Sequence, residues 1–219
     1  MPLCFFMRFV LFDLDGTLID SRLDLANSIN AALVEFSLKP LPNEKIYSFV
    51  GNGVRRLVED CLKEENAVHL FDGVMEFFFA HYYEHLLDNT VLYEGVLDVL
   101  ERLKTKNTQM FVITNKSFIF TKRVLEGLGI DGYFRDVVCG DSLPFRKPHP
   151  QPILTLRDRH GLELDGGVMV GDSENDIEAA RAAGVKIGWA AYGFRGEDIL
   201  RQYEVDFVLK KPIELLNLV

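Results

Sequence analysis

The sequence has few of the features that mark secreted, membrane-spanning or nucleic-acid-binding proteins. It contains three cysteines in 219 residues, and the odd number and wide spacing of Cys4, Cys61 and Cys139 fit neither a disulfide framework nor a metal site. Lysine and arginine number 24 against 33 acidic residues, and the net charge of −9 argues against a nucleic-acid or anionic-membrane partner. The few, widely spaced cysteines and the excess of acidic residues predict a cytoplasmic protein. An anionic small molecule would bind to it only where positive charge is concentrated.

Long hydrophobic runs are also missing from the start of the chain. The apolar opening at residues 1–7 has no basic leader and no small-residue cleavage site, and Arg8 interrupts it well short of the length that spans a bilayer. We interpret it as a short extension before the first strand, with Met7 as an alternative start. We find no internal repeat, and 219 residues suit one large domain or a domain with a sizeable insertion.

The stretch at residues 9–18, Phe-Val-Leu-Phe-Asp-Leu-Asp-Gly-Thr-Leu, is the most informative in the chain. Four apolar residues run directly into Asp13, as in a strand that is covered on both faces. Asp13 and Asp15 are two apart on an extended segment and therefore point to the same side. Two carboxylates about 4 Å apart repel by about 4 kcal/mol at a moderate effective dielectric, so the pair calls for a cation. The alternative is an ordinary strand that ends in an Asp-Gly turn.

Residues 20–90 are predicted to be almost wholly helical. Ser21 and Asp24 resemble a capping box, and the apolar residues that follow recur at the spacing of one helical face. Two prolines end this helix, and a Gly-Asn-Gly turn at residues 51–53 precedes another amphipathic helix. Residues 70–88 predict a further helix that is rich in phenylalanine and tyrosine.

From about residue 93 the pattern changes to alternating helices and strands. Buried strands are predicted at 110–114, 137–139, 168–171, 186–190 and 207–209, and the last helix is expected near 196–203. Such alternation indicates a parallel sheet with helices on both faces and ligands beyond the carboxyl ends of the strands. We therefore expect a doubly wound α/β core formed by residues 1–18 and 91–219, with a helical domain at residues 19–90 inserted after the first strand.

Polar residues collect where the predicted strands end. Thr114 and Asn115 follow one strand and open a helix, whose free N–H groups favour an anion. Lys147 stands before a helix that begins with a proline, and the run Gly-Asp-Ser-Glu-Asn-Asp at 171–176 follows another strand. Each of these could be a helix cap or a solvated charge. Their convergence with the first two carboxylates at one edge of a sheet favours a functional site.

Taken in order, these segments resemble the motifs of the haloacid dehalogenase-like superfamily, and specifically of its phosphatases that carry a helical cap after the first motif. The four motifs span most of the chain: Asp13-Leu14-Asp15-Gly16-Thr17, Thr114-Asn115, Lys147 and Gly171-Asp172-Ser173-Glu174-Asn175-Asp176. Within the superfamily, the runs at 50–53, 114–116 and 147–150 are most similar to the phosphoglycolate phosphatase group. The resemblance implies a Rossmann-like core with a cap domain.

The resemblance also implies a reaction. A small phosphorylated acid, 2-phosphoglycolate, would be hydrolysed through an aspartyl-phosphate intermediate, which splits one difficult displacement into two easier ones. Asp13 would be the nucleophile, and Asp15 would protonate the leaving oxygen and later activate water. Lys147 and Thr114 would offset the charge on the transferring phosphoryl group.

The same resemblance assigns a cofactor and the residues around it. Mg²⁺ would be held by the Asp13 side chain, the Asp15 backbone carbonyl and Asp172, since this ion prefers oxygen ligands. Asp176 would orient Lys147 without touching the substrate.

The expected substrate-binding residues come from both domains: Thr17 and Asn115 from the core, and Gly51, Asn52, Gly53 and Arg56 from the cap. We hypothesise that the turn at 51–53 closes over the site and presents N–H groups, with Arg55 or Arg56, to the substrate carboxylate. The alternative is that the glycines simply permit a tight turn and that both arginines are solvated.

Other functions remain open from the sequence. Within the superfamily these are a pyrophosphatase-like or a sugar phosphomutase-like enzyme, whereas a true haloacid dehalogenase is disfavoured because those relatives lack an acid at the position of Asp15. A signalling receiver domain uses similar residues but is much shorter and has no helical insert, and a non-catalytic binding protein would not need every catalytic residue type. The oligomeric state, monomer or homodimer, is not predicted.

Overall fold

The computed structural model describes residues 7–196 and 198–218, so that Cys4 and most of the expected N-terminal extension lie outside the described residues. The chain divides into two compact units. One unit combines the residues up to Ile19 with those from Leu92 onward, and the other is Asp20–Val91. Within the described part of the chain, no helix is both long enough and apolar enough to cross a membrane.

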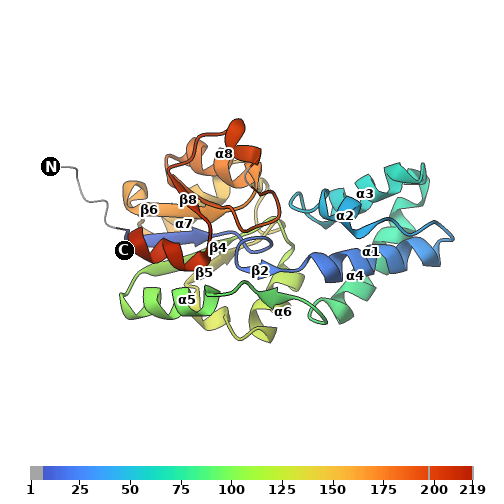
Figure 1. Ribbon diagram of the computed structural model, residues 1–219, viewed down its shortest axis with the longest axis horizontal. Helices are drawn as coiled ribbons and strands as arrows, with labels where there is room; N and C mark the ends of the chain where they lie inside the picture. Colours follow the sequence, from blue (N-terminus) through green and yellow to red (C-terminus); the bar gives the residue numbers. More distant parts are fainter. Residues whose placement is uncertain (1–6, 197, 219) are drawn as a thin grey trace. The chain divides into compact units, whose positions relative to one another are not determined.

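A six-stranded parallel sheet forms the centre of the first unit (Figure 1). Its strands are β1 (Phe9–Phe12), β4 (Gln109–Ile113), β5 (Asp136–Val138), β6 (Gly167–Gly171), β7 (Lys186–Ala190) and β8 (Phe207–Leu209). Their order is β5-β4-β1-β6-β7-β8, so the chain first builds on one side of β1 and then on the other. This order confirms the predicted doubly wound α/β fold and puts the switch point, where such sheets bind ligands, beside β1.

The strands of this unit are connected by α5 (Val96–Thr105), α6 (Phe118–Gly127), α7 (Gln151–His160) and α8 (Glu174–Ala183). Strand β1 is buried on both faces because its side chains alternate between two layers. Leu11 belongs to an apolar cluster with Ile153 of α7 and Ile177 of α8. Phe12, the next residue, lines a small apolar cavity with Val96 of α5. This double coverage explains why β1 is apolar up to its last residue.

The second unit is helical and consists mainly of α1 (Arg22–Glu35), α2 (Asn43–Tyr47), α3 (Val54–Glu64) and α4 (Phe71–His85). Helices α1 and α4 pack against each other, and both carry buried side chains, among them Leu33 of α1 and Phe78 of α4. The aromatic residues of α4 lie partly in this core, where the rings of Phe78 and Tyr82 stack with their centroids 5.4 Å apart. The short strands β2 (Ile19–Asp20) and β3 (Val91–Leu92) pair in a separate two-stranded sheet.

The capping box expected at Ser21 and Asp24 is wrong. Ser21 is the N-cap residue of α1, but the Asp24 carboxylate bonds elsewhere. It accepts hydrogen bonds from the backbone N–H of Asn89 and Thr90, at 2.9 and 2.8 Å, and from the side chains of both residues, each at 2.8 Å. Four charge-assisted hydrogen bonds outweigh the reciprocal bond of a local cap. Asp24 therefore ties the first helix of the unit to its last residues.

Short 3₁₀ helices complete the described residues: Val68–Leu70, Asp131–Tyr133, Leu164–Gly166, Asp198–Arg201 and Pro212–Leu218. The helix expected near 196–203 is reduced to one of these, and the segment from Pro212 to Leu218 was not predicted to be helical.

An ion-pair cluster joins edge strand β5 to helix α7. Asp136 accepts hydrogen bonds from His160 Nε2 at 2.9 Å, from an Arg159 guanidinium N–H at 3.3 Å and from the Val137 N–H at 2.8 Å. Partial burial alone would raise the pKa of the Asp136 carboxyl, but these donors outweigh burial and lower the pKa below its ordinary value.

Candidate active site

The carboxyl ends of β1, β4 and β6 are level with one another. Phe12, the last residue of β1, pairs with Val112 of β4 and with Val170 of β6. The Asp13 N–H then donates to the Val170 carbonyl at 2.9 Å, which continues the ladder by one residue. This register brings the polar residues that follow each strand to one edge of the sheet.

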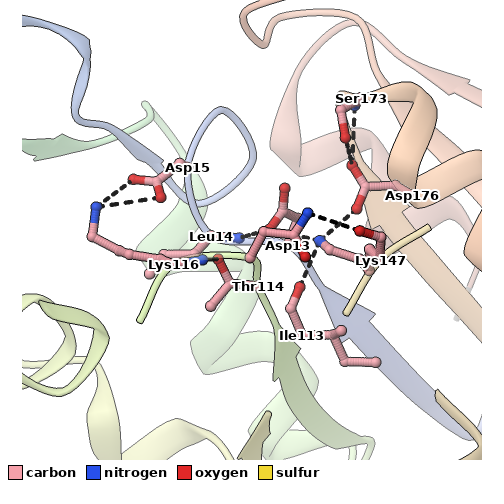
Figure 2. A network of polar contacts seen from close by, with 10 residues as sticks. Asp13, Leu14, Asp15, Ile113, Thr114, Lys116, Lys147, Ser173 and Asp176 are labelled. Carbon is pink, nitrogen blue, oxygen red and sulfur yellow. Dashed lines mark hydrogen bonds and ion pairs between the residues drawn. The ribbon is translucent and has the colours of Figure 1, made fainter. Parts of the chain in front are cut away.

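A buried ammonium group lies at the centre of that edge (Figure 2). The Nζ atom of Lys147 is 2.8 Å from Asp13 Oδ1 and 2.6 Å from Asp176 Oδ1, and it donates to the Ile113 carbonyl at 2.7 Å. Burial alone would lower the pKa of Lys147, but the two carboxylates outweigh burial and raise it above its ordinary value. Lys147 therefore stays charged although its side chain is only 1% exposed.

Asp176 is held on both of its oxygens. Its Oδ1 pairs with Lys147, and its Oδ2 accepts hydrogen bonds from the Ser173 N–H at 3.0 Å and the Ser173 hydroxyl at 2.7 Å. Ser173 and Asp176 thus form a capping box at the start of α8, which sequence reasoning considered only as a possible cap. One local motif therefore begins the helix and also directs a carboxylate oxygen toward the buried ammonium group.

Asp172 is held by a segment that the motifs did not include. Its Oδ2 accepts a hydrogen bond from the Phe194 N–H at 2.7 Å. The neighbouring Gly193 comes so close that a Cβ atom built on it would lie 2.4 Å from the Asp172 Cβ. Gly16, at a φ of +89°, makes a similar approach, since its Cβ would lie 2.2 Å from Asp172 Oδ2. Nothing in the local sequence around residue 193 signals this contact.

Three carboxylates crowd this end of the sheet. Oxygen atoms of Asp13, Asp172 and Asp176 lie within 4.8 Å of one another. Burial, reinforced by Asp176, raises the pKa of Asp13 to about 7, even though Lys147 partly offsets the effect. Burial also raises the pKa of Asp172 well above its ordinary value, with further contributions from the other two carboxylates. A cluster of buried oxygen ligands with excess negative charge could bind a metal cation.

Asp15 belongs to a second ion pair, which Figure 2 shows beside the Lys147 group. The Nζ atom of Lys116 is 3.0 Å from Asp15 Oδ1 and 3.3 Å from Oδ2. The Lys116 N–H donates to the Thr114 hydroxyl at 3.2 Å, so this pair is linked to the end of β4. Sequence reasoning missed Lys116. The available signal was its position directly after Thr114 and Asn115, at the helix that faces the site.

The other predicted core residues are also placed at this edge. The Asn115 side-chain amide donates to the Lys147 carbonyl at 3.1 Å and so connects two of the motifs. Thr17 is fully buried, and its carbonyl accepts a hydrogen bond from the Tyr192 hydroxyl at 3.0 Å. Within the described residues, the Thr17 hydroxyl itself has no hydrogen-bond partner.

The predicted glycine turn lies in the helical unit. Gly51 and Gly53 have φ values of +119° and +80°, which side chains strongly disfavour, and Gly53 is the N-cap residue of α3. Both glycines are therefore required by the turn itself. Their contact with a substrate, and that of Asn52, stays a prediction.

The two arginines of α3 interact within their own unit. Arg56 is 2.9 Å from Asp60 and 3.4 Å from Glu59, one turn along the same helix. The Arg55 guanidinium lies over the Phe71 ring, 4.6 Å from its centroid. Such exposed ion pairs are weak, and substrate binding by either arginine stays a prediction.

Known proteins resemble this chain over most of its length. The sequence pattern of the haloacid dehalogenase-like hydrolases matches residues 10–190. A phosphoglycolate phosphatase of Colwellia psychrerythraea is 38% identical over 214 residues, which cover 94% of each chain. Another, from Aquifex aeolicus, is 36% identical over 212 residues, which cover 97% of this chain and 96% of that protein. The crystal structure of a predicted phosphoglycolate phosphatase from Haemophilus somnus matches with a TM-score of 0.92 at 32% identity, over 96% of this chain and 97% of that one. These matches confirm the resemblance drawn from the motifs.

Proposed function

Because the chain belongs to the haloacid dehalogenase-like hydrolase family, we propose that it hydrolyses 2-phosphoglycolate to glycolate and phosphate with the help of Mg²⁺. The chain is an enzyme and a phosphatase, like the relatives that it matches. The metal, the covalent intermediate and the substrate are the proposal. One observation supports the choice of substrate: relatives called phosphoglycolate phosphatase match 94% and 97% of this chain at 38% and 36% identity.

The acidic cluster supports the choice of metal. Asp13 and Asp172 offer buried carboxylate oxygens, and their pKa values are raised by burial and by the neighbouring carboxylates, which Lys147 only partly offsets. Both oxygens of Asp176 are engaged by Lys147 and Ser173, so we assign the metal to Asp13, Asp172 and the Asp15 carbonyl. When bound, Mg²⁺ would neutralise charge on the phosphoryl oxygens and on the carboxylates around them.

The reaction would proceed in two displacements. A carboxylate oxygen of Asp13 attacks phosphorus while the bond from phosphorus to the leaving oxygen breaks, and Asp15 gives its proton to that oxygen. Asp15 then takes a proton from a water molecule, which attacks the aspartyl-phosphate and releases phosphate and free Asp13. Lys147, next to Asp13, and Thr114 would stabilise the charge on the transferring group.

The helical unit, Asp20–Val91, would serve as the cap of this enzyme. A cap can admit substrate and water when open and exclude solvent during phosphoryl transfer when closed. The turn at Gly51, Asn52 and Gly53 and the nearby Arg56 are the residues through which it would contact the substrate, with Thr17 and Asn115 contributing from the core.

A panel of phosphate esters tests the proposal. It comprises 2-phosphoglycolate, p-nitrophenyl phosphate, a sugar phosphate and pyrophosphate, each assayed with Mg²⁺, after EDTA and after Mg²⁺ is restored. We expect the highest kcat/KM for 2-phosphoglycolate, loss of activity in EDTA and its recovery with Mg²⁺. A phosphorylated Asp13 should be trapped by acid quench and identified by mass spectrometry. Preference for pyrophosphate or a sugar phosphate would refute the substrate while leaving the phosphatase activity in place.

A further inference from the structure

We propose that Lys116 selects substrates whose leaving group is negatively charged, by binding the carboxylate attached to the leaving oxygen. The inference rests on the proposed function, because it concerns the part of 2-phosphoglycolate that departs. It assigns substrate selection to the core unit, in addition to any contribution of the cap.

The site contains two separate ammonium groups with different surroundings (Figure 2). Lys147 is enclosed by Asp13, Asp176 and the Ile113 carbonyl, at distances of 2.6 to 2.8 Å. Lys116 instead lies against both oxygens of Asp15, at 3.0 and 3.3 Å. Lys147 therefore lies next to the proposed nucleophile, Asp13. Lys116 lies next to Asp15, the proposed proton donor to the leaving group.

The backbone of Lys116 is fixed. Its N–H donates to the Thr114 hydroxyl at 3.2 Å, and its carbonyl accepts a hydrogen bond from the Gly140 N–H at 2.9 Å. Gly140 packs directly on this segment, since a Cβ built on it would lie 2.2 Å from the Asn115 carbonyl oxygen. The Lys116 side chain is only 2% exposed. A long side chain that is already ordered loses little entropy when it binds a ligand.

The reach of Lys116 follows from the role of Asp15. A proton donor must come within about 2.6–3.2 Å of the oxygen that it protonates. Lys116 touches the same carboxylate, and in 2-phosphoglycolate a single methylene separates the leaving oxygen from the substrate carboxylate. An ammonium group has three N–H donors and can serve two carboxylates at once. The substrate carboxylate therefore falls beside Lys116 when the leaving oxygen lies beside Asp15.

Charge gives a second reason for this assignment. The edge of the sheet carries Asp13, Asp15, Asp172 and Asp176, so an additional carboxylate on the substrate would be repelled unless a cation stood next to it. Lys116 provides that cation at the leaving-group side. Esters with uncharged leaving groups would gain nothing from it, and this difference makes the residue a determinant of specificity.

The test compares 2-phosphoglycolate with ethyl phosphate, which has an equally simple leaving group without the carboxylate. The quantity measured is the ratio of the two kcat/KM values. Lys116→Gln keeps an N–H donor for Asp15 and removes the charge, whereas Lys116→Met keeps the length of the chain and removes both. Lys116→Arg keeps the charge. Lys122→Gln, at an exposed position of helix α6, which begins two residues after Lys116, is the matched control. Circular dichroism verifies that each variant is folded.

We expect the ratio to fall about 10- to 100-fold in Lys116→Gln and Lys116→Met, which is the usual worth of a hydrogen bond between charged groups. Lys116→Arg should keep most of the preference, and Lys122→Gln all of it. An equal loss for both esters would mean that Lys116 only positions Asp15, and this result would overturn the inference. An unchanged ratio in both uncharged variants would overturn it as well.

A binding measurement separates recognition from turnover. Calorimetry compares 3-phosphonopropionate, a non-hydrolysable analogue with the carboxylate, and propylphosphonate, which lacks it. The wild type should prefer the first ligand, and Lys116→Gln should lose that preference by a similar factor. A wild-type kcat/KM ratio near one would refute the proposed substrate itself. A high wild-type ratio that survives in Lys116→Gln would refute the role of Lys116 alone.

Discussion

Replacing Lys147 by methionine should destabilise the core unit more than any change of shape can account for. Methionine is nearly as long as lysine, so the change removes mainly the charge and its hydrogen bonds. These are the contacts with Asp13 at 2.8 Å, with Asp176 at 2.6 Å and with the Ile113 carbonyl at 2.7 Å. Two buried carboxylates then face each other without a cation.

The size of the effect follows from burial. Asp176 is fully buried, and its Oδ1 would lose the ammonium group that pairs with it. Breaking a buried ion pair by removing one partner costs about 3–5 kcal/mol, because the other charge stays buried and uncompensated. Replacing Asp176 by asparagine in the Lys147→Met background removes that charge while an amide oxygen can still accept from Ser173. The double variant should therefore be about 1–3 kcal/mol more stable than Lys147→Met.

Urea unfolding, followed by tryptophan fluorescence, measures these free energies. The single tryptophan, Trp189, is fully buried in β7 and reports on the core unit alone. EDTA must be present throughout, because a bound cation would itself stabilise the native state and hide the loss. Wild type, Lys147→Met, Asp176→Asn and the double variant complete the thermodynamic cycle.

Two results would refute this account of Lys147. One is a loss of less than about 1 kcal/mol in Lys147→Met, which is the range of an exposed ion pair. The other is a loss of unfolding free energy on Asp176→Asn that is as large in the Lys147→Met background as in the wild type. Either result would mean that the two residues do not depend on each other for their charge.

Three further predictions follow from the site and its support. Asp13→Asn should reduce turnover by orders of magnitude and abolish the trapped phosphoenzyme, and retention of more than a few per cent of activity would exclude a covalent role. Gly193→Ala, whose Cβ would lie 2.4 Å from that of Asp172, should weaken Mg²⁺ binding in calorimetry by about tenfold, because overpacking costs about 1–3 kcal/mol. Gly132→Ala, with no atom within 4 Å of the added Cβ, should bind normally, and equal affinities in both variants would contradict the contact. The pKa of Asp136 is lowered by folding, so its stabilising effect is present above the unfolded pKa of about 4 and is lost as the pH falls through the folded pKa. Urea unfolding of Asp136→Asn should therefore depend less on pH below about pH 4 than that of the wild type, and equal slopes would contradict this.

The core of the fold and most of its site could be predicted because the signals are local. Strand β1 is apolar to its last residue and is followed at once by Asp13, and the same pattern recurs where β4 leads into Thr114 and β6 into Asp172. In a parallel sheet the ends of such strands meet at one edge whatever the lengths of the connections. The rule does not need the strand order, which the sequence did not provide.

Residues that support the site from outside the motifs could not be predicted. Gly193 and Phe194 hold Asp172, but they follow β7, and nothing near them marks a close approach of two backbones. Lys116 directly follows Thr114 and Asn115, but it looks like any lysine just before a helix until its distance of 3.0 Å from Asp15 is known. Both contacts join segments that lie far apart in the sequence, and a single sequence contains no record of such pairs.

The same four-residue pattern, serine followed three positions later by aspartate, begins two helices, but the aspartate makes different hydrogen bonds in each. At α8, Asp176 folds back on Ser173 and uses its second oxygen for Lys147. At α1, Asp24 forms no capping box with Ser21 and instead accepts four hydrogen bonds from residues 89 and 90. A carboxylate forms a capping box only if no stronger set of hydrogen-bond donors from elsewhere in the chain competes for its oxygens. At α8 the buried ammonium group and the serine bind different oxygens and reinforce each other, whereas at α1 the distant donors compete with the cap and replace it. The local pattern therefore predicts that a helix begins, and the tertiary partners decide what its carboxylate does.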